Sequence, residues 1–374
     1  MCTVKKTSLR WMLPRLGLIL IGSLLGLLMA EGLARMIAPA GHADLLFNSP
    51  DSSPQGLYVN DPDLLLIPAP GFKATVQSLD YEVPLRINAL SLRGPDLIET
   101  DSNWLAVGDS FTMAVQVSED DTFSGQLSAT SDATFLNAGV DGYSTWQSLK
   151  RYERMIAEGV ELEGVLLTFF LGNDFQDNTH FEALSRQASQ LEPGSPIPRA
   201  ELPWIEGLLL RNSVLYAHYR VWRKARDIES GDDHDRGRWQ QELSIFTPGG
   251  QANLNHLSGK TKEALLALKR ATDAQGDALL VTIAPPAFVV DSSRLEPTFE
   301  IVGLDPSTAL IDAPGQLADR ILSELSIPSC DLTGALRDAH ASGQELYFRY
   351  DGHWTVDGHT VVADTIRACM ESLP

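Results

Sequence analysis

Cysteine is scarce in this sequence, which contains only Cys2, Cys330 and Cys369 among 374 residues. None of them belongs to a Cys-x-x-Cys pair, so their spacing gives no support to a zinc or thiol-redox site. Cys2 precedes the first apolar segment and therefore cannot be the cysteine of a lipoprotein cleavage site. In an exported domain Cys330 and Cys369 can form a disulfide, but a pair of free buried thiols fits the sequence equally well.

Basic residues are also under-represented, because 29 Lys and Arg face 49 Asp and Glu, for a formal net charge of −20. Nucleic-acid backbones require Lys and Arg, so this balance excludes nucleic acid as an expected partner. A tightly held polyanionic polymer is disfavoured for the same reason. The sequence also lacks a G-x-S-x-G motif, which argues against the nucleophile elbow of α/β-hydrolases.

One long apolar run stands near the N-terminus, from Leu16 to Ala30. Basic residues precede it without an acidic one, and such a flank stays in the cytoplasm. We predict a cytoplasmic tail over residues 1–10 and a transmembrane signal-anchor over 11–37, with the rest of the chain outside the cytoplasm as the periplasmic part of a single-pass inner-membrane protein. The competing interpretation is a signal peptide cleaved at Ala38-Pro39-Ala40, which exports the same domain. The basic residues are Lys5, Lys6, Arg10 and Arg15.

Beyond the apolar run, short apolar segments alternate with helical patterns. Residues 38–83 resemble a tether with short strands, and residues 86–95 alternate before a turn at Gly94-Pro95. The alternation over residues 84–374 predicts one α/β domain, a three-layer α/β/α sandwich with a central parallel sheet. A helical insertion interrupts it near 178–260, and within this insertion the helix 204–226 forms a lid, a packing layer or a substrate- or membrane-facing cap. The expected strands are 104–107, 134–137, 165–170 and 278–284, and the expected helices are 145–157, 261–274 and 355–373.

The strongest local motif, Gly108-Asp109-Ser110, directly follows the first of these strands. Open parallel sheets place their chemistry at the carboxyl ends of strands. A serine that opens a helix there lies where the helix dipole favours a developing negative charge. Asp and Ser are also common helix N-caps, so the tripeptide alone fits a structural role better.

A serine nucleophile needs a base, and His353 is the best candidate. Asp351 lies two residues before it, where the carboxylate can fix the tautomer of the imidazole and stabilise the imidazolium. His359 falls inside the last helix and is interpreted as a packing residue. The other histidines have no comparable setting.

Two more loops follow predicted strands and carry small or amide residues. The backbone N–H of Gly139 and the side-chain amide of Asn173 can each donate to a substrate oxyanion, although both residues are equally common in turns. The four segments all fall at strand ends of one alternating chain, which brings them to one edge of the sheet. Acyl transfer requires a nucleophile, a base and oxyanion donors at one place.

This ordered set of Ser110, Gly139, Asn173 and His353 resembles the four sequence blocks of the SGNH (GDSL) hydrolase family. The resemblance implies a flavodoxin-like fold, with Ser110 as nucleophile and its own N–H in the oxyanion hole. It implies that Gly139 and Asn173 are the other donors and that His353 is the base, paired with Asp351. The entry segment with Asn88 and Arg93 is similar to that of membrane-anchored members. This chain departs from the family pattern in the single residue between Asp351 and His353, at Ala114 and Gln116, and at Ser91, where anchored members carry glycine.

The expected activity is therefore serine-dependent hydrolysis of an acyl ester on an envelope glycan or lipid, through an acyl-enzyme on Ser110. An O-acyltransferase that passes an acetyl group to a polysaccharide hydroxyl would use the same residues. A carbohydrate-binding module without turnover is a third alternative. The chemistry calls for no metal and no organic cofactor, and the expected partners are the acyl ester and the membrane around the N-terminal helix.

Overall fold

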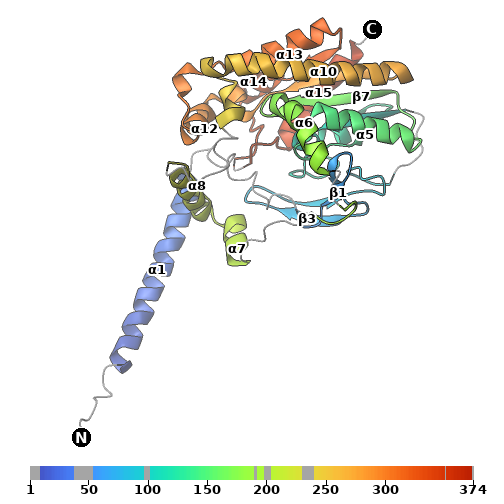
Figure 1. The fold of residues 1–374 in the computed structure, drawn as a ribbon. Helices are drawn as coiled ribbons and strands as arrows, with labels where there is room; N and C mark the ends of the chain where they lie inside the picture. Colours follow the sequence, from blue (N-terminus) through green and yellow to red (C-terminus); the bar gives the residue numbers. More distant parts are fainter. Residues whose placement is uncertain are drawn as a thin grey trace.

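The chain folds into an α/β body from which one long helix extends (Figure 1). This helix, α1 (Leu9–Ile37), contains an apolar stretch, Pro14–Ile37, with a mean hydropathy of 2.1 and no buried residues. It is long and apolar enough to cross a membrane. The computed structural model describes residues 9–37, 54–96, 102–188, 192–197, 204–229, 240–349 and 351–372. The expected cleavage site at Ala38-Pro39-Ala40 lies outside these residues.

A five-stranded parallel sheet forms the centre of the body, as predicted. Its strand order places the first strand, β5, between β6 and β7, so that the order along the chain reverses at β5. This is the flavodoxin-like order, and ligands bind such sheets at the reversal point. The short edge strand β9 was not predicted, because two of its three residues are polar. In spatial order the strands are β6 (Thr134–Asn137), β5 (Asn103–Gly108), β7 (Gly164–Phe170), β8 (Ala278–Ala284) and β9 (Ser329–Asp331).

Helices cover both faces of the sheet, which completes the predicted three layers. Alternate residues of β5 enter opposite cores: Leu105 and Val107 pack on one face, Trp104 and Ala106 on the other. The strands are apolar throughout because both of their faces are buried. The first face is covered by α5 (Thr145–Ala157), α10 (Gln251–Gln275) and α13 (Ala313–Glu324), and the second by α4 (Phe123–Thr130), α14 (Thr333–Ala341) and α15 (Val356–Glu371).

Two antiparallel hairpins lie in the segment that was predicted to be a tether with short strands, and the last of their strands ends at Arg86. They pack against the loops that follow β5 and β6, where they share a third apolar cluster with Met113 and Val140. Residues 87–96, which alternate in sequence, form isolated bridges and no continuous strand. Asn88 folds this segment into a turn by accepting from the N–H groups of Leu90 and Leu92. The hairpins are β1 (Tyr58–Asp61) with β2 (Leu65–Pro68) and β3 (Lys73–Gln77) with β4 (Glu82–Arg86).

The helical insertion begins with α6 (Asp174–Ala188), which packs against α5 and α10. The single helix predicted over 204–226 is two helices, because the chain breaks at Ser213, which caps the second of them. Helix α10 starts ten residues before its predicted beginning. The remaining elements are α3 (Ser110–Met113), α7 (Trp204–Asn212), α8 (Val214–Glu229), η1 (Pro248–Gly250), α11 (Ala287–Val290), η2 (Ser292–Arg294), α12 (Leu295–Ile301) and η3 (Pro306–Thr308).

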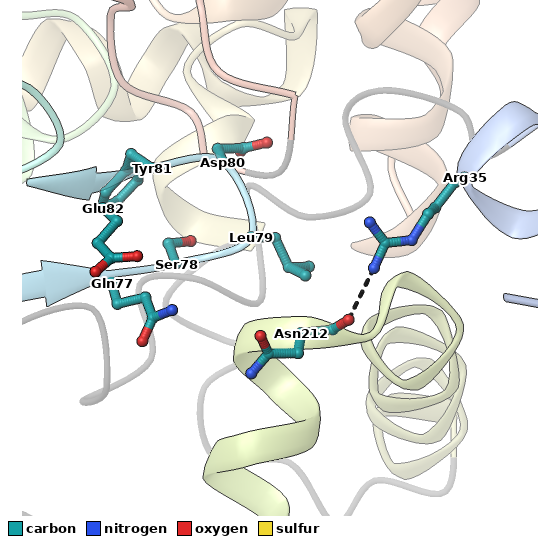
Figure 2. A pocket seen from close by; sticks show the side chains of 8 residues that line it. All are labelled: Arg35, Gln77, Ser78, Leu79, Asp80, Tyr81, Glu82 and Asn212. Atoms are coloured by element: carbon teal, nitrogen blue, oxygen red, sulfur yellow. Dashed lines mark hydrogen bonds between the residues drawn. The ribbon is translucent and has the colours of Figure 1, made fainter. Parts of the chain in front are cut away.

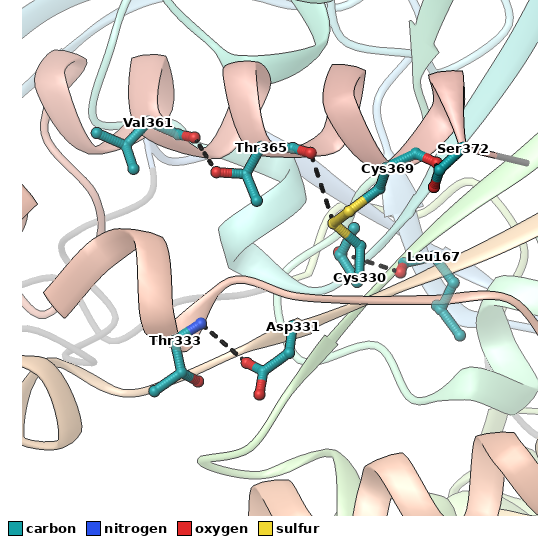
Figure 3. The surroundings of a disulfide bond; sticks show 9 residues. Leu167, Cys330, Asp331, Thr333, Val361, Thr365, Cys369 and Ser372 are labelled. Carbon is teal, nitrogen blue, oxygen red and sulfur yellow. Dashed lines mark hydrogen bonds between the residues drawn. A yellow bond between two sulfur atoms is a disulfide. The ribbon is translucent and has the colours of Figure 1, made fainter. Parts of the chain in front are cut away.

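Cys330 and Cys369 form a disulfide (Figure 3), which settles the alternative that the sequence left open. The bond joins β9 to α15 across 39 residues of sequence, with the two Cα atoms 6.0 Å apart. It therefore fastens the edge of the sheet to the helix that follows His353. Such bonds persist mainly in oxidising compartments.

Candidate active site

Ser110 lies at the carboxyl end of β5, in a turn that only glycine at position 108 permits. Gly108 has a φ of +147°, and a Cβ on it would lie 2.5 Å from Thr112 Oγ1 and 2.8 Å from the Thr168 carbonyl oxygen. The chain therefore leaves the sheet sharply and starts α3 at Ser110.

Asp109, and not Ser110, is the N-cap of α3. Its carboxylate accepts a hydrogen bond of 2.9 Å from the Phe111 N–H. The side chain is buried, and burial raises the pKa of Asp109 to about 7. The capping role that the motif suggested is thus taken by Asp109, which leaves the Ser110 hydroxyl for another partner.

That partner is His353. Its Nε2 lies 2.7 Å from Ser110 Oγ, and its Nδ1 lies 2.5 Å from Asp351 Oδ1. The backbone N–H of His353 donates to the same carboxylate oxygen at 3.0 Å, so Asp351 holds both the ring and the backbone of the histidine. The structure brings these three predicted residues into one hydrogen-bonded relay, with a single residue between acid and base.

The relay shifts the pKa values of both His353 and Asp351. Burial alone would lower the pKa of His353, but the charge of Asp351 and its hydrogen bond raise it above its usual value. Burial alone would raise the pKa of Asp351, but the charge of His353, with hydrogen bonds from His353 and Tyr81, lowers it. Asp351 is therefore a carboxylate near neutral pH, and His353 has an increased affinity for the proton that it would accept from Ser110.

Tyr81 is a site residue that the sequence did not indicate. Its hydroxyl donates to Asp351 Oδ2 at 2.9 Å, and Gln116 Nε2 lies 3.5 Å from the same oxygen. Tyr81 is buried, and burial together with the Asp351 charge raises its pKa well above the usual range, so it stays a donor. It follows the β3–β4 turn, 270 residues from Asp351 in sequence, and no local motif marks it.

Aromatic rings pack around the His353 imidazole. The ring centroid of Phe111 lies 4.8 Å from that of His353, 4.8 Å from that of Trp354 and 4.1 Å from that of Phe170. Phe111 directly follows Ser110, and Phe170 ends the neighbouring strand β7. Ser110, His353 and the end of β7 are thereby held around the Phe111 side chain.

The structure corrects the role predicted for Gly139. Its N–H donates to the side chain of Asn137 at 3.1 Å, so this group is not an open donor for a substrate oxyanion. A Cβ on Gly139 would lie 2.4 Å from the Met113 nitrogen and 2.6 Å from Thr112 Cβ. Gly139 is therefore required for the close approach of the loop after β6 to α3.

Asn173 lies at the end of β7, which pairs with β5, so it reaches the same edge of the sheet as Ser110. Its side chain is half-buried, and its backbone carbonyl accepts the N–H groups of Gln176 and Asp177 at the start of α6. The next residue, Asp174, is buried and accepts from the Phe170 N–H at 2.8 Å. The role of the Asn173 side chain as an oxyanion donor stays a prediction.

The segment after Ser110 is fixed by the buried guanidinium of Arg93, which donates to the carbonyl oxygens of Met113, Ala114 and Val117. Burial lowers the pKa of Arg93 to about 10. Ala114 and Ser91, two of the departures from the family pattern, have φ angles of +52° and +59°. Glycine adopts this conformation without strain, which explains its frequency at such positions.

A serine, an imidazole and a carboxylate lie in one relay at the reversal point of a parallel sheet, which is the arrangement that serine hydrolases use. Residues 251–374, which include Asp351 and His353, match the family described as SGNH hydrolase-like domain, acetyltransferase AlgX. This C-terminal third of the chain is thus similar to an SGNH hydrolase-like domain.

Solved structures of other proteins are similar to this chain at low identity. A lipolytic protein of the G-D-S-L family from Veillonella parvula has 14% identity and a TM-score of 0.38, over 73% of this chain and 100% of that chain. An acetylxylan esterase from Geobacillus stearothermophilus, solved as a catalytic mutant, has 13% identity and a TM-score of 0.37, over 74% of this chain and 97% of that chain. No curated protein matches this chain.

Proposed function

We propose that this protein is a serine-dependent acyl-ester hydrolase that acts on an acylated envelope glycan or lipid. The observation that carries the proposal is the continuous relay from Ser110 Oγ through His353 to Asp351, at 2.7 and 2.5 Å. The match of residues 251–374 to an SGNH hydrolase-like domain supports ester chemistry, and the position at the carboxyl edge of the sheet supports access by a substrate.

In the proposed reaction Ser110 Oγ attacks the ester carbonyl carbon while His353 Nε2 takes its proton. Asp351 stabilises the resulting imidazolium. His353 then returns the proton to the leaving alcohol as the C–O bond breaks, which leaves an acyl group on Ser110. A water molecule attacks this ester, again with His353 as base, and the carboxylic acid leaves as Ser110 regains its proton.

For the oxyanion we assign the Ser110 N–H, the Asn173 amide and, in place of Gly139, the Gly142 N–H. The loop after β6 begins beside the nucleophile turn, where the Val140 N–H donates to the Gly108 carbonyl at 3.1 Å. Gly142 is exposed in this loop with a φ of +72°. A crystal structure of the phosphonate adduct tests the assignment, since each donor must lie within about 2.7–3.1 Å of the phosphoryl oxygen.

A second candidate, O-acyltransfer to a polysaccharide hydroxyl, is favoured by the match of residues 251–374 to a family described as an acetyltransferase. The steps up to the acyl-enzyme are identical, and a sugar hydroxyl replaces water in the second half. Incubation with an acyl donor, with and without sugar acceptors, separates the two. Acylated sugar identifies the transferase, and free acid produced at an unchanged rate identifies the hydrolase.

We also propose that α1 is an uncleaved anchor that places the body outside the inner membrane. The apolar stretch, its basic flank and the disulfide support this topology. Contacts between Glu31 in α1 and Ser213 at the start of α8 support retention of the helix, because cleavage after it would remove them. The intact mass of protein extracted from the membrane fraction tests this, and a mass lacking residues 1–40 contradicts it.

Labelling with a fluorophosphonate tests the nucleophile. The full chain in detergent is expected to label, and Ser110→Ala to lose the label. Ser118→Ala is a matched control, since Ser118 lies in the same segment but its hydroxyl donates to Asp121 and not to an imidazole. Unlabelled wild type, under conditions that label a known serine esterase, would exclude the mechanism.

A further inference from the structure

The outer end of α1 is bound to the junction between α7 and α8. The Glu31 carboxylate accepts from the Ser213 hydroxyl at 2.7 Å and from the N–H groups of Val214 and Leu215 at 2.9 and 3.0 Å. Arg35 donates to Glu31 at 2.8 Å. It also donates to the Asn212 carbonyl at 2.8 Å (Figure 2). Helix α8 thus has its N-terminal groups satisfied by a side chain of the membrane helix, so the three helices form one unit.

The position of Glu31 along α1 sets the depth of this junction. Arg15 and Glu31, the charged residues that bound the apolar run, are sixteen positions apart. At ~1.5 Å per residue this is about 24 Å, slightly less than the ~30 Å of bilayer hydrocarbon. Glu31 therefore lies at the outer boundary of the hydrocarbon, and the α7–α8 junction lies at the same depth.

Helix α7 carries a row of exposed apolar side chains. Trp204, Ile205, Leu208 and Leu209 are 76%, 51%, 50% and 38% exposed. Their spacing places them on one face of a helix. Tryptophan in particular favours the boundary between water and lipid. A helix that packed on the catalytic body would bury this face instead of presenting it.

The direction in which α7 extends from the body also favours contact of its apolar side chains with the membrane. Its Asn212 end contacts Arg35 at the top of α1. From there the helix extends away from the body on the side on which α1 leaves it (Figure 1). The Trp204 end therefore points toward the bilayer that α1 would cross.

We propose that α7 inserts its apolar face into the outer leaflet of that bilayer, held there by the Glu31 contact with α8. The inference rests on the proposed anchoring by α1. Insertion of α7 gives the body a fixed orientation, with the β3–β4 turn facing the membrane. A cavity of about 340 Å³ lies between this turn, Arg35 and Asn212 (Figure 2), and Tyr81 at its wall contacts Asp351. The site is thus held near the surface where a membrane-borne acyl ester would be presented.

The experiment places an environment-sensitive fluorophore on single cysteines of the full chain in lipid nanodiscs. The background is Cys2→Ser, because the other two cysteines form the disulfide. Leu208→Cys tests α7, Leu24→Cys reports on α1, and Leu310→Cys is an exposed control in the loop before α13. Lipids with a nitroxide on the acyl chain should quench the label at 208 at least twofold more than the label at 310.

The reference labels separate the possible failures. Quenching at position 24 without quenching at 208 retains the anchor and overturns the insertion of α7. Absence of quenching at 24 overturns the anchor itself. A blue shift at 208 without lipid quenching assigns the surface to a protein partner and also overturns the proposal. Glu31→Gln is expected to lower the quenching in the Leu208→Cys background and to leave it unchanged in the Leu24→Cys background.

Discussion

Tyr81 and Asp351 are joined by a buried hydrogen bond of 2.9 Å between the phenol and the carboxylate of the proposed catalytic relay. The bond connects the β3–β4 hairpin to the loop that carries His353. The phenol stabilises the negative charge on one oxygen of Asp351, and the other oxygen binds His353. Hydrogen bonds to charged groups contribute about 1.5–3 kcal/mol. Tyr81 is therefore expected to tune the base without touching the substrate.

Tyr81→Phe removes this bond and leaves the carboxylate charge concentrated on the side of His353. The pKa of His353 should then rise further, so the acid limb of kcat/KM moves to higher pH. At neutral pH we expect a loss of about tenfold, at the lower end of the energy of such a bond. The pH dependence of ester hydrolysis measures the shift.

Tyr143→Phe is the matched control. Tyr143 is also buried, and its hydroxyl donates to the Leu66 carbonyl at 2.5 Å, away from the relay. This variant should lose stability without moving the acid limb. Equal shifts in the two variants, or none in Tyr81→Phe, would show that the phenol acts only through folding.

Asp351→Asn is predicted to move the acid limb in the opposite direction. The Asp351 charge raises the pKa of His353, so its removal lowers that pKa. Activity requires neutral His353, which forms as the pH rises through its pKa, and the limb therefore moves to lower pH. Loss of the orienting carboxylate should reduce kcat about 10³–10⁴-fold. If the acid limb of the residual activity lies at the same pH as in wild type, the Asp351 charge does not raise the pKa of His353 and the assignment is wrong.

The sheet was largely predictable from the sequence because its strands are buried on both faces. The expected strand 134–137 and helix 145–157 match β6 and α5 to the residue. The hydrophobic pattern of the sequence did not locate strands that are short or half-exposed. Strand β9 has three residues, and the hairpins use mixed polar and apolar residues that do not alternate cleanly.

The site was predictable where a motif and a strand end coincide, as at Ser110 and His353. It was not predictable where a residue acts through tertiary contact. Tyr81 approaches Asp351 only because the hairpin folds over the loops after β5 and β6. The error at Gly139 has a related cause, since a glycine in a loop serves close packing as readily as donation, and only the Asn137 contact distinguishes them.

Alanine substitution distinguishes the two glycines of the loop after β6. Gly139→Ala places a methyl group 2.4 Å from the Met113 nitrogen, a backbone atom that can move only with α3. We expect a loss of about 3 kcal/mol or more in the free energy of unfolding, with reduced labelling of Ser110. The added methyl group of Gly142→Ala meets no atom within 4 Å. The free energy of unfolding should therefore fall only because alanine is strained in the left-handed conformation of this position, by about 1–2 kcal/mol. Equal losses in urea unfolding would contradict this assignment.

The disulfide between Cys330 and Cys369 is predicted to stabilise the domain by constraining the unfolded chain. Closing a loop of 39 residues corresponds to about 4 kcal/mol by chain entropy. The double variant Cys330→Ala, Cys369→Ala should lose close to this amount in urea unfolding of the full chain in detergent. Wild type with a reductant should approach the variant, and the reductant should not affect the variant itself.

Cys2→Ser controls for the third cysteine and should unfold like wild type. At 25 °C the double variant is expected to keep labelling by the fluorophosphonate, because the His353 ring is also held by Asp351 and by packing against Phe111. On heating, the label should be lost at a lower temperature than in wild type, since α15, which follows the His353 loop, is no longer joined to β9. An identical urea midpoint with and without reductant would show that the bond does not stabilise the fold.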